Sequence, residues 1–334
     1  MDYSKYLNPA VASLPPSGIR RFFDLAANIP DCISLGVGEP DFVTPWEIRD
    51  AAIKSIQSGR TQYTSNAGLL SLREEIAGYL SSRFKADYDP KTEIIVTIGA
   101  SEAIDLALRT LVTAGDEVLI PSPSYVSYAP NAAIVGGTAV PLETRADDGF
   151  VLTPEVLEKA ITPRSKVLIL PYPNNPTGAI MTRERLEKIA GVIEKHDLFV
   201  ISDEIYAELT YGEKHASFAA IPGMKKRTVL INGFSKAFAM TGWRLGYFCA
   251  PEPVAKAAYK IHQYTIMCAP TASQVAGEAA LRSGREDDYR AVTEMRESYD
   301  IRRRFLLGKF NEMGLKTFEP RGAFYVFPSV ESTG

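Results

Sequence analysis

The middle of the chain alternates short apolar runs with amphipathic helical stretches, and this pattern restricts the fold most. The apolar runs span residues 93–98, 117–120, 166–170, 198–202, 228–231 and 245–250. They show no inward–outward alternation, which is typical of strands that are buried on both faces. Such strands occur where helices cover both sides of a mostly parallel sheet. The sequence therefore predicts an α/β fold built on this kind of sheet.

Signals outside the strands predict further elements. Apolar residues between positions 101 and 111 follow helical spacing, and Ser101 is expected to cap that helix. The segment Thr44-Pro45-Trp46-Glu47 has the form of a capping box and predicts a helix over 46–58. Close to the C-terminus, residues 323–327 are predicted to form a strand.

The chain has 334 residues, which at about 150 residues per domain suggests more than one domain. We expect a large domain over residues 46–280, where strand and helix signals alternate. We expect a smaller α+β domain that combines residues 1–45 with residues 281–334.

Charge and cysteine content exclude several classes of function. Lys and Arg number 37 against 40 Asp and Glu, a net charge of −3, so we expect neither a nucleic-acid partner nor a polybasic membrane patch. No apolar run is long enough to cross a bilayer, and the N-terminus has no signal-peptide pattern. The three cysteines are widely spaced and lack a CxxC pair, so we expect no metal site and a cytoplasmic location. Of the classes considered, an enzyme that acts on small molecules is the one that remains.

Reactive side chains follow the predicted strands, at the edge of the sheet where ligands bind in open α/β folds. Singly, such residues are more often caps, turn residues or surface charges; together they supply complementary chemistry. In chain order they are Ser101, Asn175, Asp203, Tyr206, Ser235, Lys236 and Arg244.

One part of this set suits an anion. The hydroxyls of Ser101 and Ser235, the guanidinium of Arg244 and the free N–H groups at a helix start can together hold a phosphate. Proteins bind many small cofactors through a phosphate ester group. We therefore expect a phosphate-bearing ligand at this edge.

The remaining residues suit a substituted pyridine ring. Lys236, if desolvated, can form a Schiff base with an aldehyde. Asp203 can keep a pyridine nitrogen protonated through a charge-assisted pair, and Asn175 and Tyr206 can donate to a phenolate oxygen. Phosphate, aldehyde, pyridinium and phenolate together describe pyridoxal 5′-phosphate (PLP).

Six segments in order resemble the class I aminotransferases of PLP fold type I, from about residue 17 to the end. They are SLGVGEPDF (34–42), YTSNAGLLSLRE (63–74), PNNPTG (173–178), SDEIY (202–206), SKAFAMTGWRLGY (235–247) and GAFYVFP (322–328). The stretches VSYAP and NGFSKAFAMTGWRLG are similar to those of bacterial and archaeal aspartate and aromatic amino acid aminotransferases. The resemblance implies transfer of an amino group between an L-amino acid and a 2-oxo acid such as 2-oxoglutarate, in a homodimer.

The resemblance also implies roles for individual residues. Lys236, Asp203 and Tyr206 would form the catalytic set, with Lys236 carrying the cofactor and moving protons. Asp203 would pair with the pyridine nitrogen. The other implied roles are phosphate binding for Ala100, Ser101, Ser235 and Arg244; the phenolic oxygen for Asn175 and Tyr206; ring stacking for Tyr125; the phosphate of the other subunit for Tyr63; and substrate binding for Asn175 and for Gly38, whose backbone would lie near the substrate carboxylate.

Relatives in this family usually continue past GAFYVFP into a segment whose Arg binds the substrate α-carboxylate. This chain ends at Gly334, seven residues after Phe327, and Arg321 precedes the motif and does not match that Arg. We therefore expect the smaller domain to be truncated at its C-terminal end.

Other interpretations remain. A PLP-dependent carbon–sulfur β-lyase of the same fold would keep the same cofactor residues. The turn at residues 99–103 loosely imitates the nucleophile elbow of a hydrolase, with Asp203 and His262 following in the required order. A transcription regulator with an aminotransferase-like sensor would need a DNA-binding module before Ser34, where there is no room for one.

Overall fold

The computed structural model describes residues 1–16, 25, 29, 31–32, 36 and 38–334. Within these residues, seven strands form one sheet in the order β1-β7-β6-β5-β4-β2-β3. All neighbouring strands are parallel except that β7 runs antiparallel to β1 and β6. The strands are β1 (Ile94–Thr97), β2 (Glu117–Ser122), β3 (Thr138–Glu143), β4 (Ser165–Leu170), β5 (Phe199–Asp203), β6 (Thr228–Gly233) and β7 (Gly246–Cys249).

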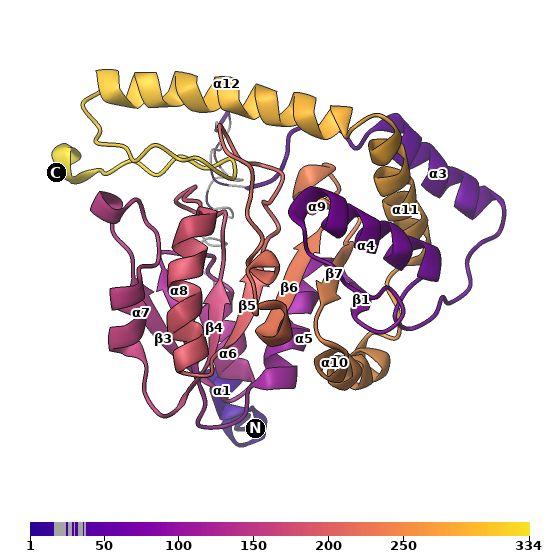
Figure 1. Cartoon of the computed structure of the whole chain (residues 1–334), viewed down its shortest axis with the longest axis horizontal. Helices are drawn as coiled ribbons and strands as arrows, with labels where there is room; N and C mark the ends of the chain where they lie inside the picture. Colours follow the sequence, from indigo (N-terminus) through magenta and orange to yellow (C-terminus); the bar gives the residue numbers. More distant parts are fainter. Residues whose placement is uncertain (17–24, 26–28, 30, 33–35, 37) are drawn as a thin grey trace.

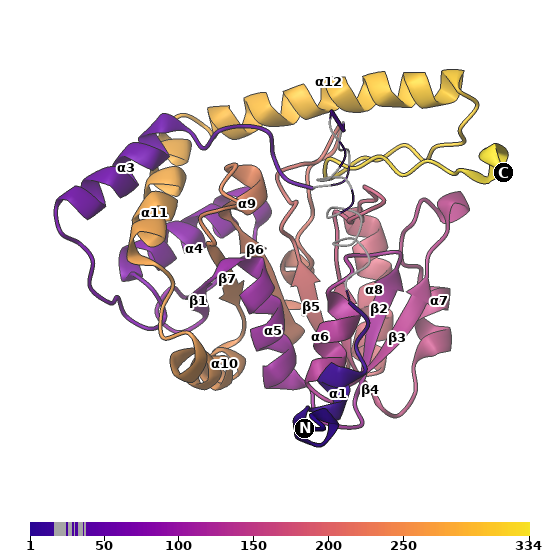
Figure 2. The ribbon, with the colours of Figure 1, turned by 180° about the vertical axis from the view of Figure 1, so that it is seen from behind.

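Helices cover both faces of the sheet, as the apolar runs predict (Figures 1 and 2). In β4, Val167 and Ile169 pack into one apolar cluster, while Leu168 and Leu170 pack into another. This split follows from the alternation of side chains along a strand. The first face carries α5 (Gly99–Leu111), α6 (Tyr128–Ile134) and α10 (Glu252–Thr265); the second carries α4 (Leu70–Phe84), α7 (Pro154–Ala160), α8 (Arg183–Lys195) and α11 (Thr271–Glu286).

The remaining helices lie around this core. The long helix α12 (Arg290–Glu312) runs across one end of the molecule, whereas α1 (Pro9–Ala12) lies beside α6 at the opposite end (Figure 1). In the described part of the chain, no helix combines the length and apolar character needed to cross a membrane. The others are α3 (Trp46–Gln57), α9 (Phe234–Ala237) and the short 3₁₀ helices η1 (Ser4–Tyr6), η2 (Ala146–Asp148), η3 (Phe218–Ala220), η4 (Lys225–Arg227) and η5 (Glu331–Thr333).

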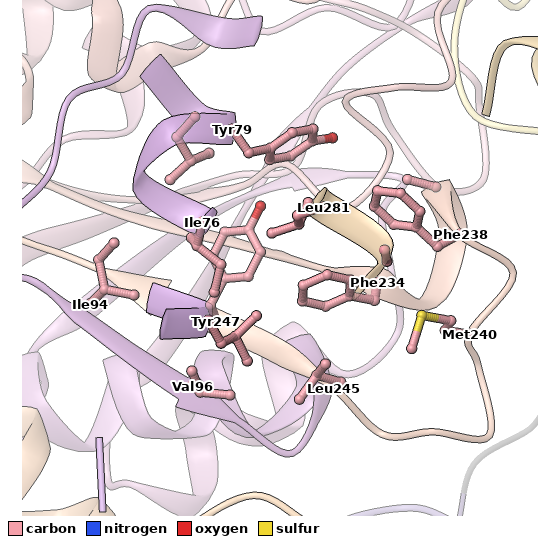
Figure 3. Packing of buried hydrophobic residues seen from close by; sticks show 14 of the residues in the cluster. Ile76, Tyr79, Ile94, Val96, Phe234, Phe238, Met240, Leu245, Tyr247 and Leu281 are labelled. Carbon is pink, nitrogen blue, oxygen red and sulfur yellow. The ribbon is translucent and has the colours of Figure 1, made fainter. Parts of the chain in front are cut away.

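The short helix α9 is anchored by aromatic packing on the second face of the sheet (Figure 3). Phe234 is almost fully buried, and its ring lies 5.6 Å from Phe238 and 6.0 Å from Tyr247. These contacts hold α9 at the end of β6, so the side chain between the two phenylalanines, Lys236, is presented from a rigid turn.

Three local expectations are wrong. Helix α5 begins at Gly99 and has no side-chain cap, so Ser101 lies inside its first turn. No capping box opens α3, because the Thr44 hydroxyl donates to the carbonyl of Ala239 at 2.7 Å instead. Residues 323–327 form no strand: Ala323 has a φ of 55°, and its N–H bonds to Leu209 rather than to a neighbouring strand.

The predicted domain organisation is not tested. The division into residues 46–280 and a smaller domain from both chain ends stays a prediction. Residues 17–24, 26–28, 30, 33–35 and 37, which were expected to belong to that smaller domain, lie outside the described residues. Part of the predicted motif at 34–42 is among them.

Candidate active site

A cavity of about 620 Å³ lies at the carboxyl edge of the parallel strands. It is lined by residues that follow β2, β4, β5 and β6 and by the start of α5. Of the residues expected to bind the cofactor or the substrate, Tyr63 does not line it, and its side chain is 80% exposed. The others all do: Gly38, Ala100, Ser101, Tyr125, Asn175, Asp203, Tyr206, Ser235, Lys236 and Arg244.

Lys236 projects from α9 into this cavity. Its Nζ donates to the carbonyl of Gly38 at 2.6 Å and lies 5.6 Å from the centre of the Tyr206 ring. Burial lowers the pKa of Lys236 to about 8; Glu39 opposes this change, and Arg244 adds to it. The amine is therefore closer to its neutral, nucleophilic form than a surface lysine is.

Asp203 ends β5 and is almost completely buried. Its Oδ2 accepts from the Tyr128 hydroxyl at 2.8 Å, and its Oδ1 accepts from the backbone N–H of Ile205 at 3.2 Å. Burial raises the pKa of Asp203 to about 6, although both hydrogen bonds oppose the change. A buried carboxylate of this kind favours a cationic partner in the cavity.

Hydrogen-bond donors gather at the start of α5. Ala100 and Ser101 lie in its first turn, where helical N–H groups lack partners within the helix. The Arg244 guanidinium lies against Gly99. A Cβ added to Gly99 would lie only 2.7 Å from the Arg244 Nη2. Ser235 lines the same cavity. This combination of a helix start, hydroxyls and a guanidinium suits a phosphate.

Asn175 and Tyr206 meet at a third side chain. The Asn175 Nδ2 donates to the hydroxyl of Tyr325 at 3.1 Å, and the hydroxyls of Tyr206 and Tyr325 are 2.7 Å apart. Burial raises the pKa of Tyr206 well above its usual value, so its hydroxyl keeps its proton and can donate it. Tyr125 packs edge-on against Tyr128, with ring centres 5.6 Å apart.

His262 does not join this cavity. It is fully buried, its Nδ1 lies 2.6 Å from Glu102 Oε1, and its Nε2 lies 2.9 Å from the carbonyl of Asn66. Both ring nitrogens are therefore occupied by other partners. The hydrolase interpretation, which needs His262 beside a nucleophilic serine, does not fit this arrangement.

Comparison with known proteins places the chain in a family. The family described as aminotransferase class I and II matches residues 30–333. The chain is a member of that family. Its Bacillus subtilis (strain 168) relative YugH, named as an aminotransferase, is 52% identical over 99% of this chain and 85% of its own length.

Two further relatives carry more specific names. The aromatic-amino-acid aminotransferase 2 of Thermococcus litoralis is 45% identical to this aminotransferase over 98% of the chain and 84% of its own length. The Thermus thermophilus aspartate aminotransferase solved with maleate has a TM-score of 0.94 at 37% identity, covering 98% of this chain and 86% of its own. The predicted PLP fold type I and the predicted class of enzyme, a transaminase, are confirmed.

Tyr128 and Tyr325 line the cavity of this aminotransferase and contact predicted cofactor-binding residues, although the sequence did not predict either as a cofactor-binding residue. Tyr128 donates to Asp203, and Tyr325 contacts both Asn175 and Tyr206. Both tyrosines belong to segments that resemble the family, VSYAP and GAFYVFP, so the signal was present. The site was predicted from residues that directly follow parallel strands. Neither tyrosine does so, and for that reason neither was predicted.

Proposed function

We propose that this aminotransferase uses PLP to move an amino group between an L-amino acid, aspartate or aromatic, and a 2-oxo acid such as 2-oxoglutarate. The observation that carries the proposal is the presence, in one cavity, of the Lys236 amine with a pKa lowered to about 8 and the buried Asp203 carboxylate. The names of relatives support the donor class: one is an aromatic-amino-acid aminotransferase, and a Pyrococcus abyssi relative is an aspartate aminotransferase.

The donor set of the cavity fits this cofactor. The start of α5, Ser235 and Arg244 would hold its phosphate. Asp203, a buried acid without a cationic partner among the described residues, would pair with its ring nitrogen. Asn175 and Tyr206 would donate to its phenolic oxygen, and Tyr125 would stack on its ring.

When bound, PLP supplies an electron sink for the electron pair that is released as the substrate Cα–H bond breaks. Lys236 would carry the proton: its neutral Nζ would accept the proton from the substrate Cα and hold it beside the reacting carbon. Burial supports this role because it lowers the pKa of Lys236 toward the working pH. The carbonyl of Gly38 holds Nζ in place, and Gly38 and Asn175 would contact the substrate carboxylate.

We further propose that the protein works as a cytoplasmic homodimer with shared active sites. Tyr63 supports a shared site, because its exposed side chain lies outside the cavity of its own subunit. The three cysteines are all free, which is usual in a reducing compartment.

Reconstitution tests the function. Purified apoprotein is mixed with PLP, and glutamate formation is measured from a panel of amino donors with 2-oxoglutarate. We expect a visible absorption band that borohydride abolishes, and turnover with aspartate, aromatic donors or both. Lys236→Ala is expected to bind PLP without covalent attachment and to lose turnover.

Two outcomes would contradict the proposal. One is a Lys236→Ala variant within about tenfold of the normal kcat, a change of only about 1.4 kcal/mol in the activation barrier. The other is release of pyruvate from cystathionine without any oxo-acid acceptor and no glutamate formation with the panel, which would identify a carbon–sulfur β-lyase.

A further inference from the structure

Tyr325 lies at the meeting point of two side chains that face the cofactor in the proposed function. It belongs to the segment that follows α12, far along the chain from both of them. Its hydroxyl accepts from Asn175 Nδ2 at 3.1 Å and lies 2.7 Å from the hydroxyl of Tyr206. Tyr325 therefore bridges Asn175, after β4, and Tyr206, after β5.

The direction of these hydrogen bonds decides what the bridge does. Because the Tyr325 oxygen already accepts from Asn175, its own proton is free to be donated to the Tyr206 oxygen. In that arrangement the Tyr206 proton is not used inside the bridge, and it remains available to a group in the cavity. If the hydrogen bond ran in the opposite direction, Tyr206 would donate its proton to Tyr325, and that proton would not be available to a group in the cavity.

Packing holds Tyr325 in this position. Its ring lies edge-on to Tyr206, with ring centres 5.8 Å apart, and is 4.9 Å from the ring of Phe324. A side-chain carbon added to Gly38 would collide with the Tyr325 hydroxyl. Gly38 also accepts the hydrogen bond from Lys236, so Tyr325 packs directly against the residue that holds the catalytic amine.

We propose that Tyr325 is a positioning residue, which accepts from Asn175, donates to Tyr206 and so directs the Tyr206 proton to the phenolic oxygen of the cofactor. The inference rests on the proposed function, because it takes PLP as the ligand. A hydrogen bond donated to the phenolic oxygen stabilises its negative charge. Without the Tyr325 hydroxyl, Tyr206 can turn its proton elsewhere, and this stabilisation weakens.

A double-mutant cycle tests the proposal. Apoproteins carrying Tyr325→Phe, Tyr206→Phe or both are titrated with PLP, and the pH midpoint of the visible band of the bound cofactor is measured. We expect Tyr325→Phe to weaken PLP binding roughly five- to tenfold, as for one lost hydrogen bond, and to raise the pH midpoint. In the Tyr206→Phe background the same change should have less than about a twofold effect.

Two further variants separate this role from a structural one. Tyr299→Phe removes a hydroxyl from the same apolar cluster, outside the bridge, and should leave PLP affinity and the pH midpoint unchanged. Replacement of Tyr325 by 3-fluorotyrosine keeps the hydroxyl and makes it a stronger donor, so the midpoint should move down rather than up. That variant keeps the proposal testable if Tyr325→Phe does not fold.

The possible outcomes are distinct. Unchanged affinity and midpoint in Tyr325→Phe, or equal effects of that change with and without Tyr206, would overturn the positioning role while leaving the proposed function intact. Failure of the unaltered chain to bind PLP at all would overturn the proposed function, and this inference with it.

Discussion

The environment of Lys236 predicts how fast the apoprotein captures its cofactor at different pH values. Only the neutral amine attacks an aldehyde, and burial lowers the pKa of Lys236 from 10.5 to about 8. The rate of borohydride-trapped PLP incorporation should therefore rise with pH and level off about one unit above that pKa. Lys236→Ala should show no such phase. A midpoint near the ordinary lysine value would contradict the effect of burial.

The burial of Asp203 should lower the stability of the folded apoprotein at neutral pH. Its pKa is raised by burial from 3.8 to about 6, so folding disfavours the ionised form. The sign follows from linkage: the folded state binds the proton more tightly, so stability falls as pH rises from about 4 to 6 and stays reduced above that range. This pKa shift corresponds to a loss of at most about 3 kcal/mol in the free energy of unfolding.

Asp203→Asn should remove this cost and raise the melting temperature of the apoprotein at about pH 8 by several degrees. The amide keeps both partners, because its oxygen accepts from Ile205 and its NH₂ can donate to Tyr128. The gain should shrink at about pH 5, where wild-type Asp203 is mostly protonated. The exposed Asp147→Asn serves as the control. A variant less stable than wild type at pH 8 would contradict the prediction.

At the scale of elements, β7 and α5 touch through their backbones at the proposed phosphate site. A Cβ added to Gly246, the first residue of β7, would lie 2.6 Å from the carbonyl carbon of Gly99 and 2.7 Å from the N of Ala100. Backbone atoms cannot yield as a flexible side chain can. Gly246→Ala should therefore displace the first turn of α5 and weaken PLP binding at least about tenfold, measured by titration of the apoprotein.

The comparison with pyridoxal, which lacks the phosphate, identifies the cause. Gly246→Ala should weaken binding of PLP more than binding of pyridoxal, because the displaced N–H groups are those that would face the phosphate. Gly191→Ala, on the exposed side of α8 with nothing within 4 Å of the added carbon, should leave both affinities unchanged. Equal losses for the two ligands would argue against phosphate binding by this turn.

The elements also show where sequence reasoning succeeds. The six strands predicted from the apolar runs between residues 93 and 250 all exist, because each is buried on both faces and so reads as a continuous apolar run. Strand β3 gave no such signal: it is an edge strand, partly exposed, and contains Pro141, which is unfavourable in strands. The apolar segment 323–327 looked like a strand, but Ala323, Phe324 and Tyr325 pack into a cluster with Tyr206 and Tyr299. Phe327 packs against Phe150 instead.

Most of the candidate site could also be predicted from the sequence, because its residues follow the predicted strands. Parallel strands end at one edge, so residues such as Asn175, Asp203 and Lys236 were expected together, and the cavity brings them together. Tyr325 reaches the same cavity from the C-terminal segment. Its position depends on how that segment folds back across the sheet edge, which spacing along the sequence does not encode.

At the scale of the whole molecule, an apolar stripe on α3 indicates where the second copy would bind in the proposed homodimer. Trp46, Ile53 and Ile56 lie on one side of the helix at helical spacing, and their side chains are 57%, 43% and 57% exposed. Tyr63, in the loop after this helix, and Tyr264, near the end of α10, are also highly exposed. Apolar residues that are exposed side by side on one helix face are candidates for an interface, and we expect the second copy of the proposed homodimer to cover them.

A mixing experiment tests whether the proposed homodimer shares its active sites. Lys236→Ala and Tyr63→Ala should each be nearly inactive alone. If Tyr63 serves the cofactor of the other subunit, a hybrid dimer contains one site with both changes and one site with neither. Random association of equal amounts puts both variants in about half of the dimers, so about a quarter of all sites should be intact.

The expected result is recovery of about a quarter of the wild-type activity after the two variants are unfolded and refolded together. The recovered activity should be absent when the separately refolded proteins are merely combined without subunit exchange. If Tyr63 instead acts within its own subunit, both sites of every hybrid carry a damaging change, and no activity returns. Hybrid dimers isolated through two different affinity tags, yet inactive, would therefore rule out a shared site while leaving the catalytic assignment of Lys236 untouched.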